Sequence, residues 1–453
     1  MDKLLSVGLD VGTTTTQLVI SELSVENKGN AFSVPEMVIG ERKLLYQSPV
    51  TFTPLISGEL VDGQKIAAWV EAQYKEAGIT KKQVDTGAVI ITGETSRKEN
   101  ARQVLHALAG FAGDFVVATA GPDLESVLSA KGAGATDFSA KTGKTVLHMD
   151  IGGGTSNLSY IENGKIIATG CLNVGGRLVK LDSAGGITYI SPVLEGLCDL
   201  SVGERPTEKQ LSEVTDFLVQ ALEMAAGLTP PTDLLCKLTT KENTGQWTPR
   251  KADVLSFSGG VADCIETVCE SLAFGDLGVL LGRAIKESSL CQGQYRLGEQ
   301  TIRATVIGAG CHSAQLSGST VFCDGVKLPQ KNLPVAMLSM PLTAEKVAKA
   351  YAGQDTETVV LALSGYPSPT YEQVQTLAKD LVAGSGDREL LLCVEQDMAK
   401  ALGQALSIRC PDRQILCLDR LSLQENSYLD VGQPVGPAFP VVIKTLILSG
   451  GQM

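Results

Sequence analysis

The amino-acid sequence predicts an α/β protein in which two related lobes face each other across a cleft. The main observation is a pair of segments that read almost alike, D-V-G-T-T-T (10–15) and D-I-G-G-G-T (150–155). Each lies between two apolar runs, which is typical of a β-hairpin with a glycine- and hydroxyl-rich turn. A second observation is the alternation of strand and helix patterns after residue 300, which predicts an additional C-terminal α/β region.

The two turns have the composition of phosphate-binding loops. Glycine lets backbone N–H groups approach a phosphate closely, and threonine hydroxyls add further donors. The carboxylates of Asp10 and Asp150 would repel a phosphate unless a cation lies between them, and Mg²⁺ combines few carboxylates with water and substrate phosphates. We expect both aspartates to be catalytic by orienting Mg²⁺ and its waters; a turn-capping role is the alternative. The expected phosphate contacts are Gly12, Thr13, Thr14, Thr15, Gly152, Gly153, Gly154 and Thr155.

The first region, residues 1–140, alternates between extended and helical patterns. One helix is well delimited, because Asp62-Gly63 precedes it and Gly78 follows it. The segment Ser139–Lys144, at the end of a glycine-bearing stretch from Gly132, is predicted to be a hinge or loop. Strands are predicted over 51–56, 88–92 and 115–119, and helices over 64–77, 99–108 and 123–130.

The second region, residues 141–299, opens with the second turn and continues into a long helix over 207–226. Thr207 and Gln210 form a capping-box pattern, and Gly227 is a stop signal. Residues 228–252 look irregular, and helices are predicted over 262–272 and 278–285. A strand over 254–257 leads into Ser258, Gly259 and Gly260, where missing Cβ atoms would let a purine lie against the backbone, although a plain turn is the alternative.

The third region, residues 300–453, alternates strands and helices, which favours largely parallel pairing. Strands are predicted over 302–307, 359–363, 390–394 and 415–418, and helices over 371–382 and 396–406.

Composition excludes several classes of function. The 453 residues carry a net charge of −12, which disfavours nucleic acid as a partner. The eleven cysteines are scattered without a CxxC pair and there are only three histidines, so no zinc or iron–sulfur motif is present. This cysteine usage indicates a reducing compartment. No apolar run approaches the ~20 residues that span a membrane.

The order of these pieces resembles the actin/Hsp70/sugar-kinase superfamily, which has two phosphate turns, two connecting helices and an adenosine loop. Here the connecting helices would be the one after Gly121-Pro122 and the one that contains Gly278. More closely, the chain resembles the family of ethanolamine ammonia-lyase reactivating factors. The segments that carry this resemblance are 8–21, 89–101, 118–135, 148–161, 254–265 and 305–321.

The resemblance implies an actin-like (Hsp70-like) two-lobe ATPase fold and a chaperone-like role. Such a factor uses ATP and Mg²⁺ to exchange damaged cobalamin in ethanolamine ammonia-lyase for intact adenosylcobalamin. ATP/ADP and Mg²⁺ are therefore the implied cofactors, and the lyase is the implied partner. The implied location is the cytoplasm; association with a bacterial microcompartment and assembly into a homo-oligomer are left open.

The residue that positions the attacking water is not in its usual place. Superfamily members often carry an acidic or amide side chain at the start of the first connecting helix, where this chain has Gly121. Asp123 or Glu125 could substitute, or help to bind a divalent cation; a solvated carboxylate at a helix start is the alternative. We take Glu125 as the candidate for both the catalytic and the metal-binding role and expect slow hydrolysis.

Two other functions fit the same fold. A small-molecule kinase would need a carboxylate base aimed at a substrate hydroxyl, and the sequence nominates none. An actin-like protein would use nucleotide only to control its assembly, and the extension after residue 300 argues mildly against a minimal filament subunit.

Overall fold

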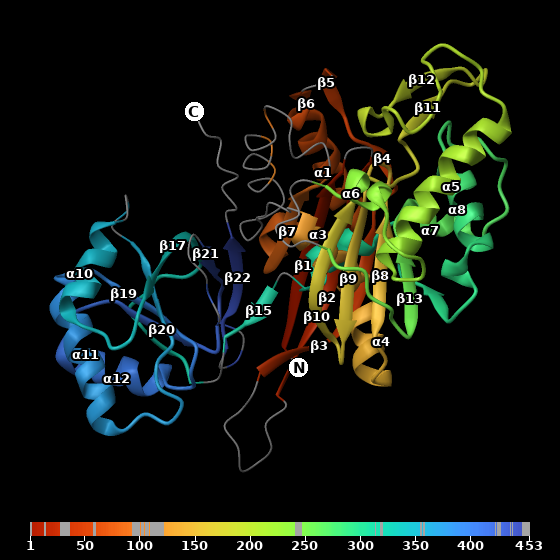
Figure 1. The fold of residues 1–453 in the computed structure, drawn as a ribbon. Helices are drawn as coiled ribbons and strands as arrows, with labels where there is room; N and C mark the ends of the chain where they lie inside the picture. Colours follow the sequence, from red (N-terminus) through yellow and green to blue (C-terminus); the bar gives the residue numbers. More distant parts are fainter. Residues whose placement is uncertain are drawn as a thin grey trace.

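The computed structural model of the chain contains two five-stranded sheets, with an eight-stranded sheet to one side (Figure 1). The predicted strand at 115–119, most of the predicted helix at 99–108, and Thr13 and Thr14 lie outside the described residues. The described residues are 2–12, 15–27, 37–57, 60–92, 100, 104, 108, 122–240, 247–312, 314–317, 320–353, 356, 358–421, 423, 427–434, 436 and 438–445.

The first sheet has the order β3-β2-β1-β7, with β4 paired to β2. Strands β1 and β2 are antiparallel, whereas β7 runs parallel to β1. Helix α1 packs on this sheet through Ile66, Val70 and Tyr74; Asp62 caps its start and Gly78, in the left-handed conformation, ends it. The bounds are β1 (Asp2–Val11), β2 (Thr15–Asn27), β3 (Met37–Gln47), β4 (Thr51–Phe52), β5 (Leu55–Ser57), β6 (Leu60–Val61), α1 (Gly63–Ala77), η1 (Lys81–Gln83) and β7 (Thr86–Ile91).

The second sheet repeats this arrangement, with the order β10-β9-β8-β13-β14. Strand β8 is antiparallel to β9 and parallel to β13, as β1 is to β2 and β7. Its largest core cluster includes residues of α5, α7 and α8, and the capping box at Thr207 is present. The bounds are β8 (Val146–Ile151), β9 (Ser156–Glu162), β10 (Lys165–Leu172), β11 (Val179–Leu181), β12 (Ile187–Ile190), η3 (Pro192–Leu194), α5 (Glu208–Ala225), α6 (Asp233–Leu238), β13 (Val254–Ser258), α7 (Gly260–Glu266), α8 (Gly278–Glu287), η4 (Ser289–Cys291) and β14 (Tyr295–Leu297).

Helices α3 (Pro122–Gly132) and α9 (Ala304–His312) join the two lobes. Helix α3 packs on β8, β9 and β10, α9 packs on β1, β2 and β7, and the two helices pack on each other. Their backbones approach so closely that a Cβ atom on Gly132 would lie 1.8 Å from the carbonyl oxygen of Ala304. A Cβ atom on Gly308 would lie 2.0 Å from the carbonyl oxygen of Leu128. Glycine is therefore required at this crossing.

The C-terminal sheet has eight strands in the order β15-β22-β21-β17-β18-β19-β20-β16. Its central strands β17 to β20 are parallel, as the sequence predicts. Helices α10, α11 and α12 cover one face of it, seen at the outer side in Figure 1. The bounds are β15 (Ala314–Leu316), β16 (Phe322–Asp324), β17 (Gln330–Leu338), α10 (Ala344–Ala352), β18 (Val360–Leu363), α11 (Tyr371–Ser385), β19 (Leu390–Val394), α12 (Ala399–Arg409), β20 (Ile415–Asp419), β21 (Ser427–Val431) and β22 (Pro440–Thr445).

The predicted α/β fold of two lobes and an additional C-terminal α/β region is confirmed, but several elements differ. The strand predicted over 302–307 is wrong, because residues 304–307 form the start of α9. The sequence of α9 shows no amphipathic period, since the helix packs on other elements on two sides. The loop predicted over 139–144 is wrong for residues 139–142, which belong to α4 (Ala135–Thr142), and is confirmed for Gly143 and Lys144, which lie between α4 and β8. The helix that contains Gly278, α8, packs on α5 and α7, so α9 takes the place of the second connecting helix.

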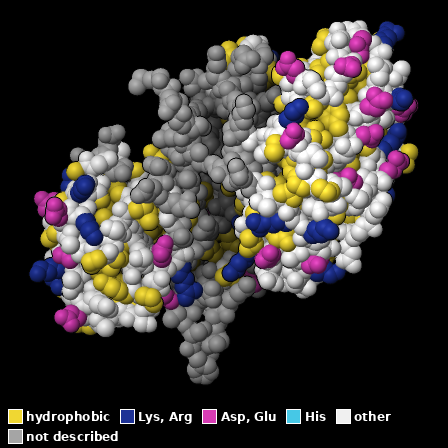
Figure 2. Space-filling view, in the orientation of Figure 1, with side chains coloured by type: hydrophobic (Ala, Val, Ile, Leu, Met, Phe, Trp, Pro, Cys, Tyr) yellow, Lys and Arg dark blue, Asp and Glu magenta, His cyan; other side chains and the backbone are white. Residues whose placement is uncertain are grey.

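The surface mixes both signs of charge. Figure 2 shows lysine and arginine side chains interspersed with aspartate and glutamate over the face in view. Among the described residues no helix is long and apolar enough to cross a bilayer. All eleven cysteines are free thiols.

Candidate functional site

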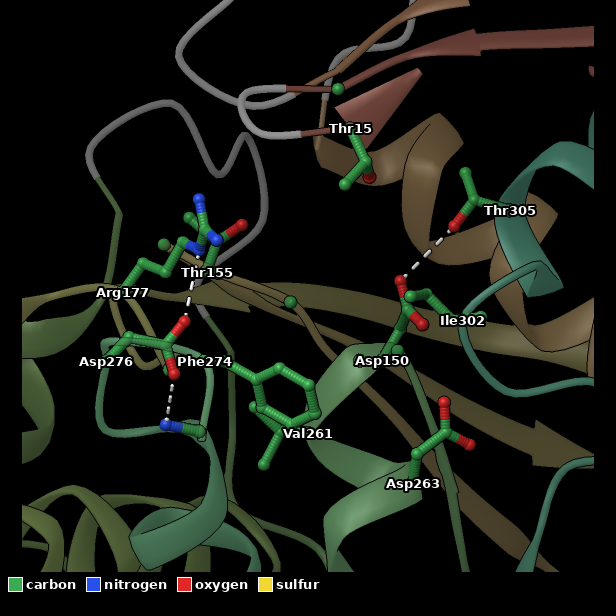
Figure 3. Close-up of a pocket in the computed structure, with 18 of the residues that line it drawn as sticks. Thr15, Asp150, Thr155, Arg177, Val261, Asp263, Phe274, Asp276, Ile302 and Thr305 are labelled. Carbon is green, nitrogen blue, oxygen red and sulfur yellow. Dashed lines mark hydrogen bonds and ion pairs between the residues drawn. The ribbon is translucent and has the colours of Figure 1, made fainter. Parts of the chain in front are cut away.

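The described residues of the two glycine-rich turns share one backbone hydrogen bond at equivalent positions. In the first, Gly12 N–H donates to the carbonyl oxygen of Thr15 at 2.9 Å; in the second, Gly152 N–H donates to that of Thr155 at 2.9 Å. Both turns therefore close a β-hairpin in which the preceding strand delivers an aspartate. The two hairpins belong to different lobes and face the same cleft (Figure 3).

Each aspartate accepts a hydrogen bond from a hydroxyl next to it in the sheet. Thr92, which follows β7, donates to Asp10 Oδ1 at 3.0 Å, and Ser258 of β13 donates to Asp150 Oδ1. Thr305 of α9 donates to Asp150 Oδ2 at 3.2 Å. These hydrogen bonds hold the two carboxylates in defined positions in the lining of the cleft.

Burial makes both carboxylates easier to protonate than usual. It raises the pKa of Asp10 to about 7, an effect that the Thr92 hydrogen bond opposes and the charge of Asp150 reinforces. It raises the pKa of Asp150 to about 6, against the hydrogen bonds from Ser258 and Thr305. A cation between them would reverse this effect, because it favours the ionised carboxylates.

Behind Asp150 lies a buried chain of hydrogen bonds. His148 Nε2 is 3.0 Å from Ser258 Oγ, and its Nδ1 is 3.1 Å from Ser256 Oγ. Because Ser258 donates its proton to Asp150, His148 Nε2–H donates to Ser258, and Nδ1 accepts from Ser256. Burial lowers the pKa of His148 to about 3, so the ring is neutral. The chain thus fixes the direction of the Ser258 hydroxyl.

Two amide oxygens at the cleft have no hydrogen-bond partner among the described residues. Gln17 is paired directly with Asp10, and Asn157 with Asp150, so in each hairpin an amide and a carboxylate share one face of the sheet. Gln17 Oε1 and Asn157 Oδ1 are buried and accept no hydrogen bond from the part of the chain that the structure describes, although Gln17 Nε2 donates to the carbonyl oxygen of Ile302 at 3.1 Å.

This donor set fits hydrated Mg²⁺. Such an ion keeps several waters and takes only one or two carboxylates from the protein, and its waters would donate to the two amide oxygens. The described residues contain no group of three or more histidine, cysteine, aspartate or glutamate side chains placed to hold a metal. The arrangement therefore suits an ion shared with phosphates better than a closed metal site.

The cleft has a volume of about 420 Å³, within the range of small-molecule sites. Both lobes line it, and α3 contributes Glu125. Ser258 does not line the cleft: it is fully buried behind Asp150. Of the other residues predicted for the site, those that line the cleft are Asp10, Gly12, Thr15, Asp150, Gly152, Gly153, Gly154, Thr155, Gly259 and Gly260.

Apolar side chains also line the cleft. Phe274 and Val261 lie side by side in Figure 3, whereas Ile302 lies next to Asp150. Gly259 has a φ of +87°, and a Cβ atom there would lie 2.3 Å from the carbonyl oxygen of Ile151, so only glycine fits this turn. Phe274 and Val261 offer an apolar surface on which a flat aromatic base can lie.

Sequence reasoning missed several of these residues. Gln17 and Asn157 follow their aspartates at the same spacing in both segments, and that repeat could have identified them. Nothing local in the sequence marks the others, because distant elements bring them to the cleft. They are Thr92, Arg177, Asp276 and Thr305.

Two curated relatives match this chain over nearly its whole length. It is 36% identical to the ethanolamine ammonia-lyase reactivase EutA of Salmonella typhimurium, with 98% of each chain covered. The relative of the same name from Escherichia coli is also 36% identical, with 98% of each chain covered. Among solved structures, the Ppx/GppA phosphatase of Aquifex aeolicus matches 68% of this chain and 99% of its own at 13% identity and a TM-score of 0.40. The profile of the family described as "Ethanolamine utilisation protein EutA" matches residues 2–449, and the chain belongs to this family.

Proposed function

We infer that this chain is an ATP- and Mg²⁺-dependent reactivase of ethanolamine ammonia-lyase, which exchanges damaged cobalamin for adenosylcobalamin. The two relatives carry the name of ethanolamine ammonia-lyase reactivase and match this chain over 98% of its length. A reactivase would act where the lyase is, and free thiols suit the cytoplasm.

The observation that carries the nucleotide half of the proposal is the repeated carboxylate–amide pair. Asp10 with Gln17, and Asp150 with Asn157, present oxygen acceptors from two lobes to one cleft. A triphosphate with Mg²⁺ supplies what these acceptors lack, namely a cation with bound water. The turns supply backbone N–H groups for the phosphates.

The cleft residues divide the work. Asp10 and Asp150 would hold the waters of Mg²⁺, which supplies charge neutralisation for the phosphates. Ser258, Thr92 and Thr305 keep the two carboxylates in place through their hydroxyls. Glu125 reaches the cleft from α3, and we assign it to orienting the attacking water. Conversion of ATP to ADP then changes what the two turns hold, so each nucleotide would favour a different angle between the lobes.

The proposal is tested by a reconstituted reactivation assay. Ethanolamine ammonia-lyase inactivated with damaged cobalamin is incubated with free adenosylcobalamin, ATP and Mg²⁺, with and without this protein. We expect lyase activity to return only when protein, ATP and Mg²⁺ are all present. Recovery that does not depend on ATP would contradict the proposal.

The variant Glu125→Gln separates binding from hydrolysis. It keeps the shape of the side chain but loses the carboxylate, so ATP should bind with nearly unchanged affinity while hydrolysis slows. A matched control is Glu162→Gln, at the far end of β9 and outside the cleft. Equal loss in both variants would remove Glu125 from the mechanism.

A further inference from the structure

The strongest remaining feature is the imbalance of charge around the cleft. Five carboxylates line it, whereas Arg177 is the single basic side chain among the described residues that line it. The carboxylates are Asp10, Glu125, Asp150, Asp263 and Asp276. A polyphosphate bound here would lie among negative charges, so its affinity would depend strongly on the position of this one guanidinium.

The backbone ties Arg177 to the second phosphate turn. Its N–H donates to the carbonyl oxygen of Gly153 at 2.6 Å, and Gly176 N–H donates to that of Gly152 at 3.1 Å. A Cβ atom on Gly175 would lie 2.4 Å from the carbonyl oxygen of Gly153, so the segment can lie this close only without a side chain there. Figure 3 shows Arg177 beside Thr155 at the turn.

The guanidinium is oriented by a second fixed group. Arg177 Nε donates to Asp276 Oδ2 at 3.1 Å, while Asp276 Oδ1 accepts from Gly278 N–H at 2.8 Å at the start of α8. Asp276 is only 7% exposed, so its position is well defined. With Nε engaged, the two Nη groups form the edge of the guanidinium that is turned away from Asp276, and this edge can bind two oxygens of one phosphate.

The same guanidinium also contacts the first lobe. It lies 5.7 Å from the ring centroid of Phe52, which belongs to β4 and is 71% exposed. A cation over an exposed aromatic ring is a weak contact that a phosphate could displace or reinforce. Arg177 therefore contacts residues of both lobes as well as the second phosphate turn.

We propose that Arg177 binds the terminal phosphate of ATP and sets the preference of this protein for ATP over ADP. The inference rests on the proposed nucleotide site and adds the residue that recognises the nucleotide state. ADP lacks the group that the Nη edge would hold, so its binding depends less on Arg177. Lysine is a poor replacement, because its ammonium is a point charge on a flexible stem and lacks the planar pair of N–H groups that binds two oxygens of one phosphate.

The test is calorimetric titration of the full-length protein with Mg²⁺·ATP and Mg²⁺·ADP. Arg177→Gln should lose ATP affinity by about ten- to a hundred-fold and ADP affinity by clearly less, since a charge-assisted contact is removed. Arg177→Lys should lose most of the same preference. The matched control is Arg250→Gln, which removes a guanidinium 5.5 Å from the Tyr160 ring, outside the residues that line the cleft.

The outcomes separate this inference from the function on which it rests. A wild-type protein that binds neither nucleotide would overturn both. A wild-type protein that binds both, with an unchanged ratio of ATP to ADP affinity in Arg177→Gln, would overturn the role of Arg177 alone. Thermal unfolding of each variant verifies that the fold is intact.

Discussion

Thr305 donates a hydrogen bond of 3.2 Å to Asp150, although the two residues are 155 positions apart in the sequence. The contact links α9 to the second phosphate turn. Because α9 also packs on β1 and crosses α3, one helix contacts the carboxylate, the first sheet and the helix that covers the second sheet. A change in the angle between the lobes would therefore alter the hydrogen bond between Thr305 and Asp150.

The crossing of α3 and α9 should be intolerant of any side chain. Gly308→Ala puts a Cβ atom 2.0 Å from the carbonyl oxygen of Leu128, so the helices must separate. Overpacking of this kind costs about 1–3 kcal/mol, and we expect a loss of that size in the free energy of unfolding. Urea unfolding followed by circular dichroism measures it.

The matched control for this variant is Gly293→Ala. Gly293 has no heavy atom within 4 Å of an added Cβ atom, so its stability should stay close to that of the wild type. Equal stability of the two variants would show that the crossing can relax, and that it does not set the distance between the lobes.

The two aspartates should contribute to nucleotide binding only in the presence of Mg²⁺. Asp150→Asn and Asp10→Asn keep the shape but lose the charge, so each should weaken Mg²⁺·ATP binding by about ten- to a hundred-fold. In EDTA the variants should bind ATP at least as well as the wild type, because a repulsive charge has been removed. Titration calorimetry with and without Mg²⁺ tests this, with Asp137→Asn on the exposed side of α4 as the control.

How much of this site the sequence can predict depends on where its residues come from. Asp10 and Asp150 were predictable because strand, turn and returning strand are local and repeat in the chain. The partners of these aspartates were not, since Thr92, Ser258 and Thr305 reach them through parallel pairing and helix packing. Likewise α9 reads as a strand in the sequence, because burial on two sides removes the periodicity that identifies a surface helix. The limits 1–140, 141–299 and 300–453 remain predictions.

The stability of the Mg²⁺-free protein should carry a signature of the two carboxylates. Their folded pKa values, about 7 for Asp10 and about 6 for Asp150, lie above the unfolded value of 3.8. Because both pKa values are raised in the folded state, the protonated carboxyl groups favour the folded protein over the unfolded chain. This contribution to the free energy of unfolding is present below about pH 4 and is lost as the pH rises through 6 and 7. The double variant Asp10→Asn/Asp150→Asn has no ionisable group at these positions, so it should not show this pH-dependent loss of stability.

The measurement compares urea midpoints of the wild type and the double variant at pH 5 and pH 8 in EDTA. The stability of the variant relative to the wild type should increase between these pH values, and Mg²⁺ with nucleotide should reduce the increase. Two parallel pH profiles would mean that the aspartates are not desolvated as their burial indicates.

The buried chain behind Asp150 should contribute to both stability and metal use. His148→Leu leaves the hydroxyls of Ser256 and Ser258 without the ring that orients them, and a buried unsatisfied polar group costs about 1–3 kcal/mol. Without a donor to its oxygen, the Ser258 hydroxyl donates a weaker hydrogen bond to Asp150, so the Mg²⁺ concentration needed for half-maximal ATP binding should rise as well. Ser256→Ala is the matched control, since it removes the far end of the chain but keeps the contact between His148 and Ser258; it should lose some stability with little change in Mg²⁺ dependence. Urea unfolding and Mg²⁺ titrations at fixed ATP measure the two effects. A His148→Leu protein that loses stability but keeps the wild-type Mg²⁺ dependence would show that His148 contributes to the stability of the fold alone.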